Sequence, residues 1–208
     1  MISPIFFVFS LIVSCSYALH VQDFCVADYT APQGPAGYSC KDPAKVTVDD
    51  FVHSGFGVPS NSSNVFKFGF TPAFASNLPG LNGLGVSLGH TDVEIGGVVP
   101  IHSHPGATEL VVVAEGSSII GGFIGSNNKV YQKILNKGDT MVLPQGLYHF
   151  FVNQGTTPAI IYAAFSSEGP TVQLMDTSLF KNDLASDIIA KTTLLDAAQI
   201  QKLLGGTN

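Results

Sequence analysis

Three of the six histidines stand where their side chains could bind one metal ion. His102 and His104 are two residues apart, so on an extended strand both imidazoles point to the same face. Glu109 follows five residues after His104, across a Pro-Gly bend that could return its carboxylate to the same point. His149 lies 45 residues beyond His104, at the start of another expected strand. Three neutral imidazoles and one carboxylate suit a borderline divalent transition metal.

This ligand set also indicates the chemistry of the site. Four protein ligands leave open positions on a six-coordinate metal, which is typical of a reactive site rather than a closed structural one. One dication with one carboxylate leaves a net positive charge that would attract a small anion. The ligands alone do not select among Mn, Fe, Zn and Cu, since imidazole suits several of these metals. We expect no catalytic group separate from the metal ligands.

A simpler interpretation of the His102 and His104 pair stands beside this one, and the other histidines need no special role. A His pair on a strand is often only polar surface, so the pair by itself is a weak signal. The other three histidines, His20, His53 and His90, have no ligand neighbours in sequence. We expect them to be ordinary surface or loop residues.

Short runs rich in Val, Ile and aromatic residues must position the ligands. From residue 84 onward they recur roughly every 8–12 residues between turn signals, which predicts an all-β sandwich or barrel. The expected strands span residues 85–88, 108–114, 117–124, 130–135, 140–143, 148–153 and 159–165. Residues 19 to about 80 are interrupted by Pro, Gly and Asn, and are expected to wrap irregularly around that core.

The end of the chain changes to a helical pattern. Apolar residues at 184, 188 and 189 share one helix face, which predicts a helix over residues 183–191. Asp196 can cap a second helix that runs to Leu204 and stops at two glycines. Two short helices bury little surface between themselves, so we expect them to pack on the barrel or on another subunit.

Composition supports a folded domain and excludes two classes of protein. Of the 208 residues, 45% are hydrophobic and only 12% are charged, which excludes a largely disordered chain. The net charge is −6 and there is no basic run. Nucleic-acid binding is therefore not expected, because phosphate contacts need clustered Lys and Arg.

Residues 1–18 have the pattern of a secretory signal peptide. Residues 5–13 are almost wholly apolar, and Ser16-Tyr17-Ala18 supplies the small residues that a signal peptidase recognises. We expect cleavage after Ala18, which leaves residues 19–208 as one mature domain with an N-terminal extension and a C-terminal helical tail. The alternative is a membrane anchor, for which the apolar stretch is too short.

Secretion would place the mature chain in an oxidising compartment. Cys15 leaves with the signal peptide, so Cys25 and Cys40 remain as the predicted disulfide. The alternative is two separate buried thiols. Asn61 begins the only N-glycosylation sequon, in a polar and loop-like stretch, and is the predicted glycosylation site.

Two longer motifs surround the candidate ligands. Residues 97–109, followed by Gly116, and residues 138–149, followed by Asn153, match both cupin motifs in the right order, glycines and proline included. Residues 21–28, 40–41, 79–85 and 135–139 further resemble plant germins and germin-like proteins. The resemblance covers essentially the whole mature chain. It implies a cupin β jelly-roll barrel with one manganese ion per chain on His102, His104, Glu109 and His149.

The resemblance also implies where such a protein acts and how it assembles. Germin-like proteins are glycoproteins of the apoplast or cell wall. They form homohexamers, built as trimers of dimers, in which the C-terminal helices help to lock subunits together. No nucleic-acid partner and no membrane span are implied.

The family has two known activities, and one residue pattern separates them. True germins are oxalate oxidases and carry asparagines three and thirteen residues before the first metal histidine. Here these positions are Val99 and Gly89, which offer no side-chain hydrogen bond. We therefore expect no oxalate oxidase activity. Asn153 remains as a polar group for the second shell or the pocket.

The expected activity is of the superoxide dismutase type, which several germin-like proteins show, with a role in plant defence or the cell wall. The alternative is an auxin-like ligand-binding protein without catalysis, or a structural wall protein. An apolar ligand would need a barrel interior, for which Val99, Leu110, Val112, Met141 and Phe151 are the candidates. Plain core packing is the favoured interpretation of the same side chains, because strands of this kind need an apolar face.

Overall fold

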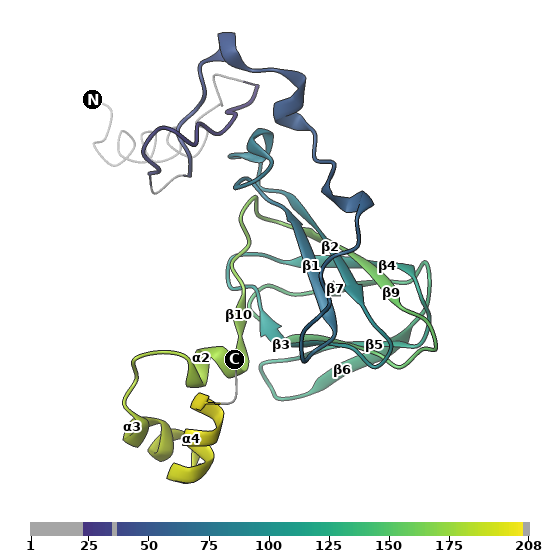
Figure 1. The fold of residues 1–208 in the computed structure, drawn as a ribbon, viewed down its shortest axis with the longest axis vertical. Coiled ribbons are helices and arrows are strands. Elements are labelled where there is room, and N and C mark those ends of the chain that lie inside the picture. The colour runs from purple at the N-terminus through teal and green to yellow at the C-terminus, as the bar shows by residue number, and fades with distance from the viewer. Residues whose placement is uncertain (1–22, 35–36, 206–208) are drawn as a thin grey trace, which may run out of the picture.

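The protein folds as two antiparallel five-stranded β-sheets that face each other (Figure 1). The computed structural model describes residues 23–34 and 37–205. In the first sheet the strand order is β1 (Phe68–Ala73), β2 (Ser87–Val93), β9 (Ala159–Phe165), β4 (Glu109–Glu115) and β7 (Thr140–Leu143). In the second it is β10 (Gln173–Leu174), β3 (Val98–Ser103), β8 (His149–Asn153), β5 (Ile119–Ile124) and β6 (Val130–Leu135). The expected all-β jelly-roll architecture is confirmed.

Alternation along the strands decides which side chains enter the core between the sheets. In β9 every second residue is buried, from Ala159 to Phe165. In β4 the buried positions are Glu109, Val111 and Val113, while Leu110 is 51% exposed. The prediction that Leu110 and Val112 line the interior is therefore wrong. Because successive strand residues face opposite sides, an inward Glu109 requires an outward Leu110.

The later strands lie close to their predicted positions, whereas two earlier ones contain prolines that hid them. β1 includes Pro72 but lies at the edge of its sheet, where one missing N–H group costs no ladder hydrogen bond. β3 includes Pro100, and its pairing with β8 shifts register between Val99 and His102. A proline is tolerated at such a bulge, and the bulge re-aims the residues that follow it.

Segments outside the sheets occupy opposite ends of the molecule (Figure 1). The N-terminal extension carries short 3-10 helices at Pro43–Lys45, Val48–Phe51 and Gly55–Gly57, and a fourth follows β1 at Pro79–Leu81. The C-terminal unit holds α2 (Met175–Phe180), α3 (Ser186–Thr193) and α4 (Ala197–Gly205) around its own small apolar core. Of these, α2 has no counterpart among the expected elements.

Asp196 caps α4 as predicted. Its carboxylate accepts a hydrogen bond from the backbone N–H of Gln199 at 2.8 Å, and the Gln199 side chain accepts one from the Asp196 N–H at 2.9 Å. This reciprocal pair satisfies two donors that the first turn of a helix leaves open. Among the described residues, no helix is long and apolar enough to cross a membrane. The predicted signal peptide lies outside the described residues.

His90 differs from its sequence-based expectation. It is only 2% exposed, because the extension around Gly55–Gly57 covers the outer face of β2. Its ring stacks on Tyr162 with centroids 5.1 Å apart and meets Phe56 edge-on at 5.7 Å. The expectation that His90 is a surface or loop residue is wrong, since neighbouring strands and the overlying chain enclose it in aromatic contacts.

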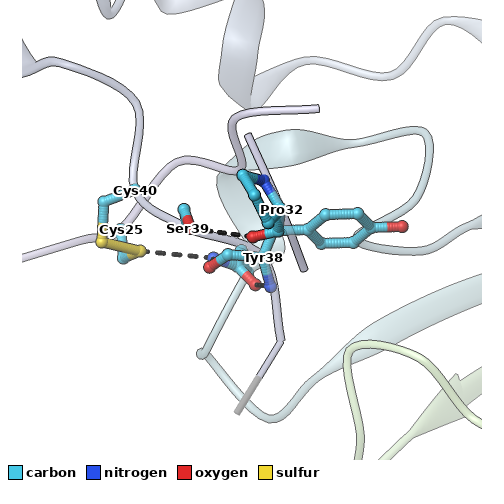
Figure 2. Close-up of a disulfide and its surroundings, with 6 residues drawn as sticks. Cys25, Pro32, Tyr38, Ser39 and Cys40 are labelled. Carbon is cyan, nitrogen blue, oxygen red and sulfur yellow. Dashed lines mark hydrogen bonds between the residues drawn. A yellow bond between two sulfur atoms is a disulfide. The ribbon is translucent and has the colours of Figure 1, made fainter. Parts of the chain in front are cut away.

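The predicted disulfide between Cys25 and Cys40 is confirmed (Figure 2). It closes the hairpin-like start of the extension, where the Ser39 hydroxyl also donates to the Pro32 carbonyl at 3.0 Å. Asn82, from the loop after β1, donates to Cys25 Sγ at 3.3 Å and to the Tyr38 carbonyl at 2.9 Å. The disulfide closes a loop within the extension, and the buried Asn82 amide fastens that loop to the domain.

Replacing Cys25 and Cys40 with serine is expected to loosen the extension. The loop spans 15 residues, for which lost cross-linking costs about 3 kcal/mol when estimated from chain entropy. Limited trypsin digestion should cut faster at Lys41 and Lys45, while fragments from the β-sheets persist. Reductant added to the parent protein should reproduce the effect. Unchanged cleavage and an unchanged melting temperature would show that the disulfide contributes little.

Candidate metal centre

Two sheets bring the four predicted ligands to one point. His102 lies near the end of β3, and the β3–β8 register sets it opposite His149, the first residue of β8. His104 follows β3 directly, and Glu109 opens β4 in the other sheet. One ligand atom from each residue lies within 4.8 Å of the others, and all four residues are buried. The cluster is thus built as the His-x-His spacing and the motifs predict.

Backbone carbonyl groups fix the tautomer of each imidazole. The Nδ1 atom of each histidine lies at hydrogen-bond distance from one carbonyl oxygen: His102 with Pro100 at 2.8 Å, His149 with Leu147 at 2.9 Å and His104 with Thr171 at 2.7 Å. Because a carbonyl only accepts, each Nδ1 carries a proton, and Nε2 is the ring atom that points to the cluster and can bind a metal ion. Such carbonyl partners are typical of metal-binding histidines.

The ligand atoms of Glu109, His104 and His149 face one another at the centre of the cluster. Glu109 Oε2 lies 2.9 Å from His149 Nε2 and 3.4 Å from His104 Nε2. Yet Glu109 Oε2 and His149 Nε2 are both buried without a hydrogen-bond partner. A buried acceptor without a donor is costly, and a cation among these atoms would satisfy them.

The protonation states suit a cation as well. Burial tends to raise the pKa of Glu109, but the imidazoles of His104 and His149, where they carry a proton toward the carboxylate, outweigh it and hold that pKa at about 2. Burial and then the charge that His149 could carry lower the pKa of His102 to about 4. Near neutral pH the metal-free cluster therefore holds an ionised carboxylate beside an uncharged His102. Protons and a metal ion would compete for the same Nε2 atoms.

An apolar cavity of about 210 Å³ adjoins three of the ligands, His102, His104 and Glu109. Thr91 is the one other polar residue on its wall. The apolar lining residues are Phe68, Phe70, Phe74, Val99, Phe151, Ile161, Phe165, Pro170, Val172 and Leu174. Val99 and Phe151 thus lie where the binding-protein hypothesis needs them. Met141 instead packs against the core cluster between the sheets.

Gly89 makes room for an aromatic ring on the cavity wall. A Cβ atom at this position would lie 2.4 Å from Cε2 of Phe70, far inside contact distance. Phe70 comes from β1 and lines the cavity, so an apolar ring occupies the space a side chain at 89 would need. Sequence reasoning missed the cavity phenylalanines of the β1 region because that region looked irregular. Phe165 could have been found, since the strand alternation of β9 turns it inward.

Asn153 lies at the opposite end of β8 from His149. It is fully buried, and its amide donates to the carbonyls of Val93 at 3.0 Å and Thr157 at 2.9 Å. Its side-chain oxygen accepts from the Gly155 N–H at 2.9 Å. These contacts tie the turn after β8 to the end of β2. Asn153 does not line the cavity among the described residues.

The stability of the metal-free protein should fall as the pH drops from 6.5 toward 4. Unfolded His102 takes up a proton near the ordinary histidine pKa of 6.5, whereas the folded residue does so only near pH 4. Between these values the unfolded state binds more protons, so the free energy of unfolding decreases, by roughly 3 kcal/mol in all. Urea unfolding at pH 7 and pH 4.5 measures it.

A His102→Gln variant should lose most of this pH dependence, whereas His53→Gln, a matched change outside the cluster, should keep it. Equal slopes in the parent protein and His102→Gln would contradict the assignment.

Comparison with known proteins places this site in a family. Residues 54–201 match the cupin family. Auxin-binding protein ABP19b of Prunus persica is 61% identical, and a germin-like protein of Morus alba is 54% identical, each over the full length of both chains. The solved structure of a recombinant oxalate oxidase in complex with glycolate superimposes with a TM-score of 0.85 at 32% identity, over 89% of this chain and 95% of the other. The chain belongs to the cupin family and, within it, to the plant germin-like proteins.

Proposed function

We propose that the protein binds one manganese ion on His102, His104, Glu109 and His149 and dismutates superoxide. The observation that carries the metal site is the set of converging, buried ligand atoms, of which Glu109 Oε2 and His149 Nε2 have no hydrogen-bond partner. Manganese is preferred because of the germin-like family, since the ligand set alone also suits other divalent metals. A bound manganese ion would supply one-electron redox chemistry, in which two superoxide ions and two protons become oxygen and hydrogen peroxide.

The chain's own residues prepare the site for a small anion. Glu109 contributes one negative charge, and histidines bind a metal ion as neutral imidazoles, so a divalent ion held there keeps a net positive charge. The carbonyl partners hold the three rings in place, so the ligands need little rearrangement. Superoxide needs only this charge and an open position on the metal.

Oxalate oxidation is not part of the proposal. A site that binds a polar dianion needs donors on its wall, and their absence costs several orders of magnitude in specificity. Here Val99 lines the cavity and Phe70 fills the space beside Gly89. The cavity therefore offers oxalate the metal but no side-chain amide.

Location and assembly follow as part of the same proposal. The disulfide fits an oxidising compartment, which supports secretion to the apoplast or cell wall. Asn61 is exposed, so a glycan could be attached there. A homohexamer, built as a trimer of dimers, would give the C-terminal helices a partner surface. A defence or wall role would follow from peroxide production.

Elemental analysis of the purified protein, with dismutase assays on the same sample, tests the proposal. We expect about one manganese per chain, activity that chelation abolishes, and recovery when manganese is returned. Folded His102→Ala protein should lose its metal, because one ligand is missing, and its activity should fall more than about 100-fold. The His53→Ala variant should keep both its metal and its activity. Full activity in folded His102→Ala protein would refute the proposal.

The cavity favours a second candidate function, the binding of an aromatic carboxylate. Five phenylalanines line its wall, and the metal ligands lie at one side. An aromatic ring could pack on the phenylalanines while its carboxylate meets the metal. The Prunus persica relative that is 61% identical carries the name auxin-binding protein, which fits this class of ligand.

Calorimetric titration with indole-3-acetate separates the two candidates. Binding should be saturable in the manganese-loaded protein and at least about tenfold weaker after chelation, because the carboxylate loses its partner. Indole-3-acetamide, which keeps the ring but lacks the charge, should bind equally weakly in both forms. If no heat of binding is detected, two functions remain: dismutation, or a structural wall protein that the metal only stabilises.

A further inference from the structure

One wall of the cavity is a short segment that leads into the C-terminal helices. We call residues 170–174 the wall segment. Its last two residues form β10, whose register sets Gln173 opposite Ser103 and Leu174 opposite the metal ligand His102. The helix α2 begins at the next residue, Met175. The wall segment therefore joins the metal centre to the C-terminal unit.

The wall segment contacts both the ligands and the cavity. Pro170, Val172 and Leu174 line the cavity. Between them, the carbonyl of Thr171 accepts the Nδ1 proton of His104 at 2.7 Å. One short stretch of chain thus closes the wall and fixes a ligand.

His104 differs in this respect from the other two ligand histidines. His102 and His149 each bond a carbonyl only two residues earlier in the chain. The partner of His104 lies 67 residues away. Local partners persist wherever their own strand is folded, whereas a remote partner is present only while the two segments stay together.

Few interactions hold the wall segment to the second sheet. Its pairing with β3 involves two residues only, Thr171, Val172 and Gln173 are exposed, and Pro170 is the one buried residue of the five. A segment with few buried apolar contacts and a short ladder opens at low free-energy cost compared with the sheet core. Before it, the Glu168 carbonyl accepts from Ala75 N–H at 2.8 Å, which anchors the chain just ahead of Pro170.

We propose that the wall segment is the positioning element of His104 and a movable side of the cavity. While it is closed, the Thr171 carbonyl holds the ring with its proton on Nδ1 and with Nε2 aimed at the cluster. When it detaches, the proton of His104 exchanges between its two nitrogens and the ligand loses its orientation. The effect on metal release rests on the metal binding proposed above, but the effect on the tautomer does not.

The test compares a loosened variant with a matched control. Pro170→Gly combined with Leu174→Ala removes the φ restraint and the buried ring before Thr171, and the cavity-lining side chain at the end of the segment. Thr171→Ala changes the same segment but keeps the backbone carbonyl and should behave as the parent protein. Melting temperatures identify the folded variants, and Pro170→Gly alone serves if the double variant does not fold.

The first measurement uses metal-free, full-length protein with ¹⁵N-labelled histidine. Long-range ¹H–¹⁵N spectra should show His104 protonated on Nδ1 in the parent protein and as a tautomer mixture in the loosened variant. His102 and His149 are internal controls, whose local carbonyl partners keep their tautomers. A His104 tautomer that is the same in both proteins would overturn the proposal.

The second measurement follows manganese release from the loaded proteins into excess chelator. We expect release about tenfold faster in the loosened variant, the usual effect of losing an outer hydrogen-bond partner, and no change in Thr171→Ala. Equal release rates would overturn the proposal even if the tautomer changed. If the parent protein holds no metal, the proposed function fails, and the spectra alone decide the positioning role.

Discussion

The buried carboxylate of Glu109 is the constraint on which the rest of the structure depends. A charge in a protein interior is tolerated only where partners compensate for its lost water, and here three imidazoles from the opposite sheet and its connection surround it. Glu109 comes from one sheet and His102 and His149 from the other, so the two sheets must meet in one register. A cation in the cluster would connect them directly, which links metal binding to folding.

The backbone prepares this cluster, and the side chains around it remain apolar. Each imidazole is oriented by a carbonyl group rather than by a polar side chain, so the wall can consist almost entirely of phenylalanine and aliphatic residues. Polarity is thus concentrated on the ligands. With a cation bound, a ligand that enters would find one positively charged point and a mostly apolar wall, which would favour very small anions and molecules with an apolar body.

Much of this was predictable from sequence where the physics is local. The i, i+2 spacing of His102 and His104 and the motifs around Glu109 and His149 identify all four ligands, and alternating apolar runs locate the strands from β4 to β9. The prolines of β1 and β3 hid those strands, because an edge position and a bulge are properties of the whole sheet. Burial of His90 under the extension and the bond from His104 to Thr171 depend on contacts between distant segments, for which one sequence carries no signal.

The close approach of Phe70 to Gly89 has a consequence for how this family can diversify. Any side chain acquired at position 89 needs the volume that the edge of the Phe70 ring occupies, so the ring must swing outward toward solvent, where it is already 41% exposed. One codon change would thus add a new group to the cavity and remove an aromatic wall in the same step. Related proteins that differ by a single substitution at position 89 could therefore bind very different ligands while keeping the same metal ligands.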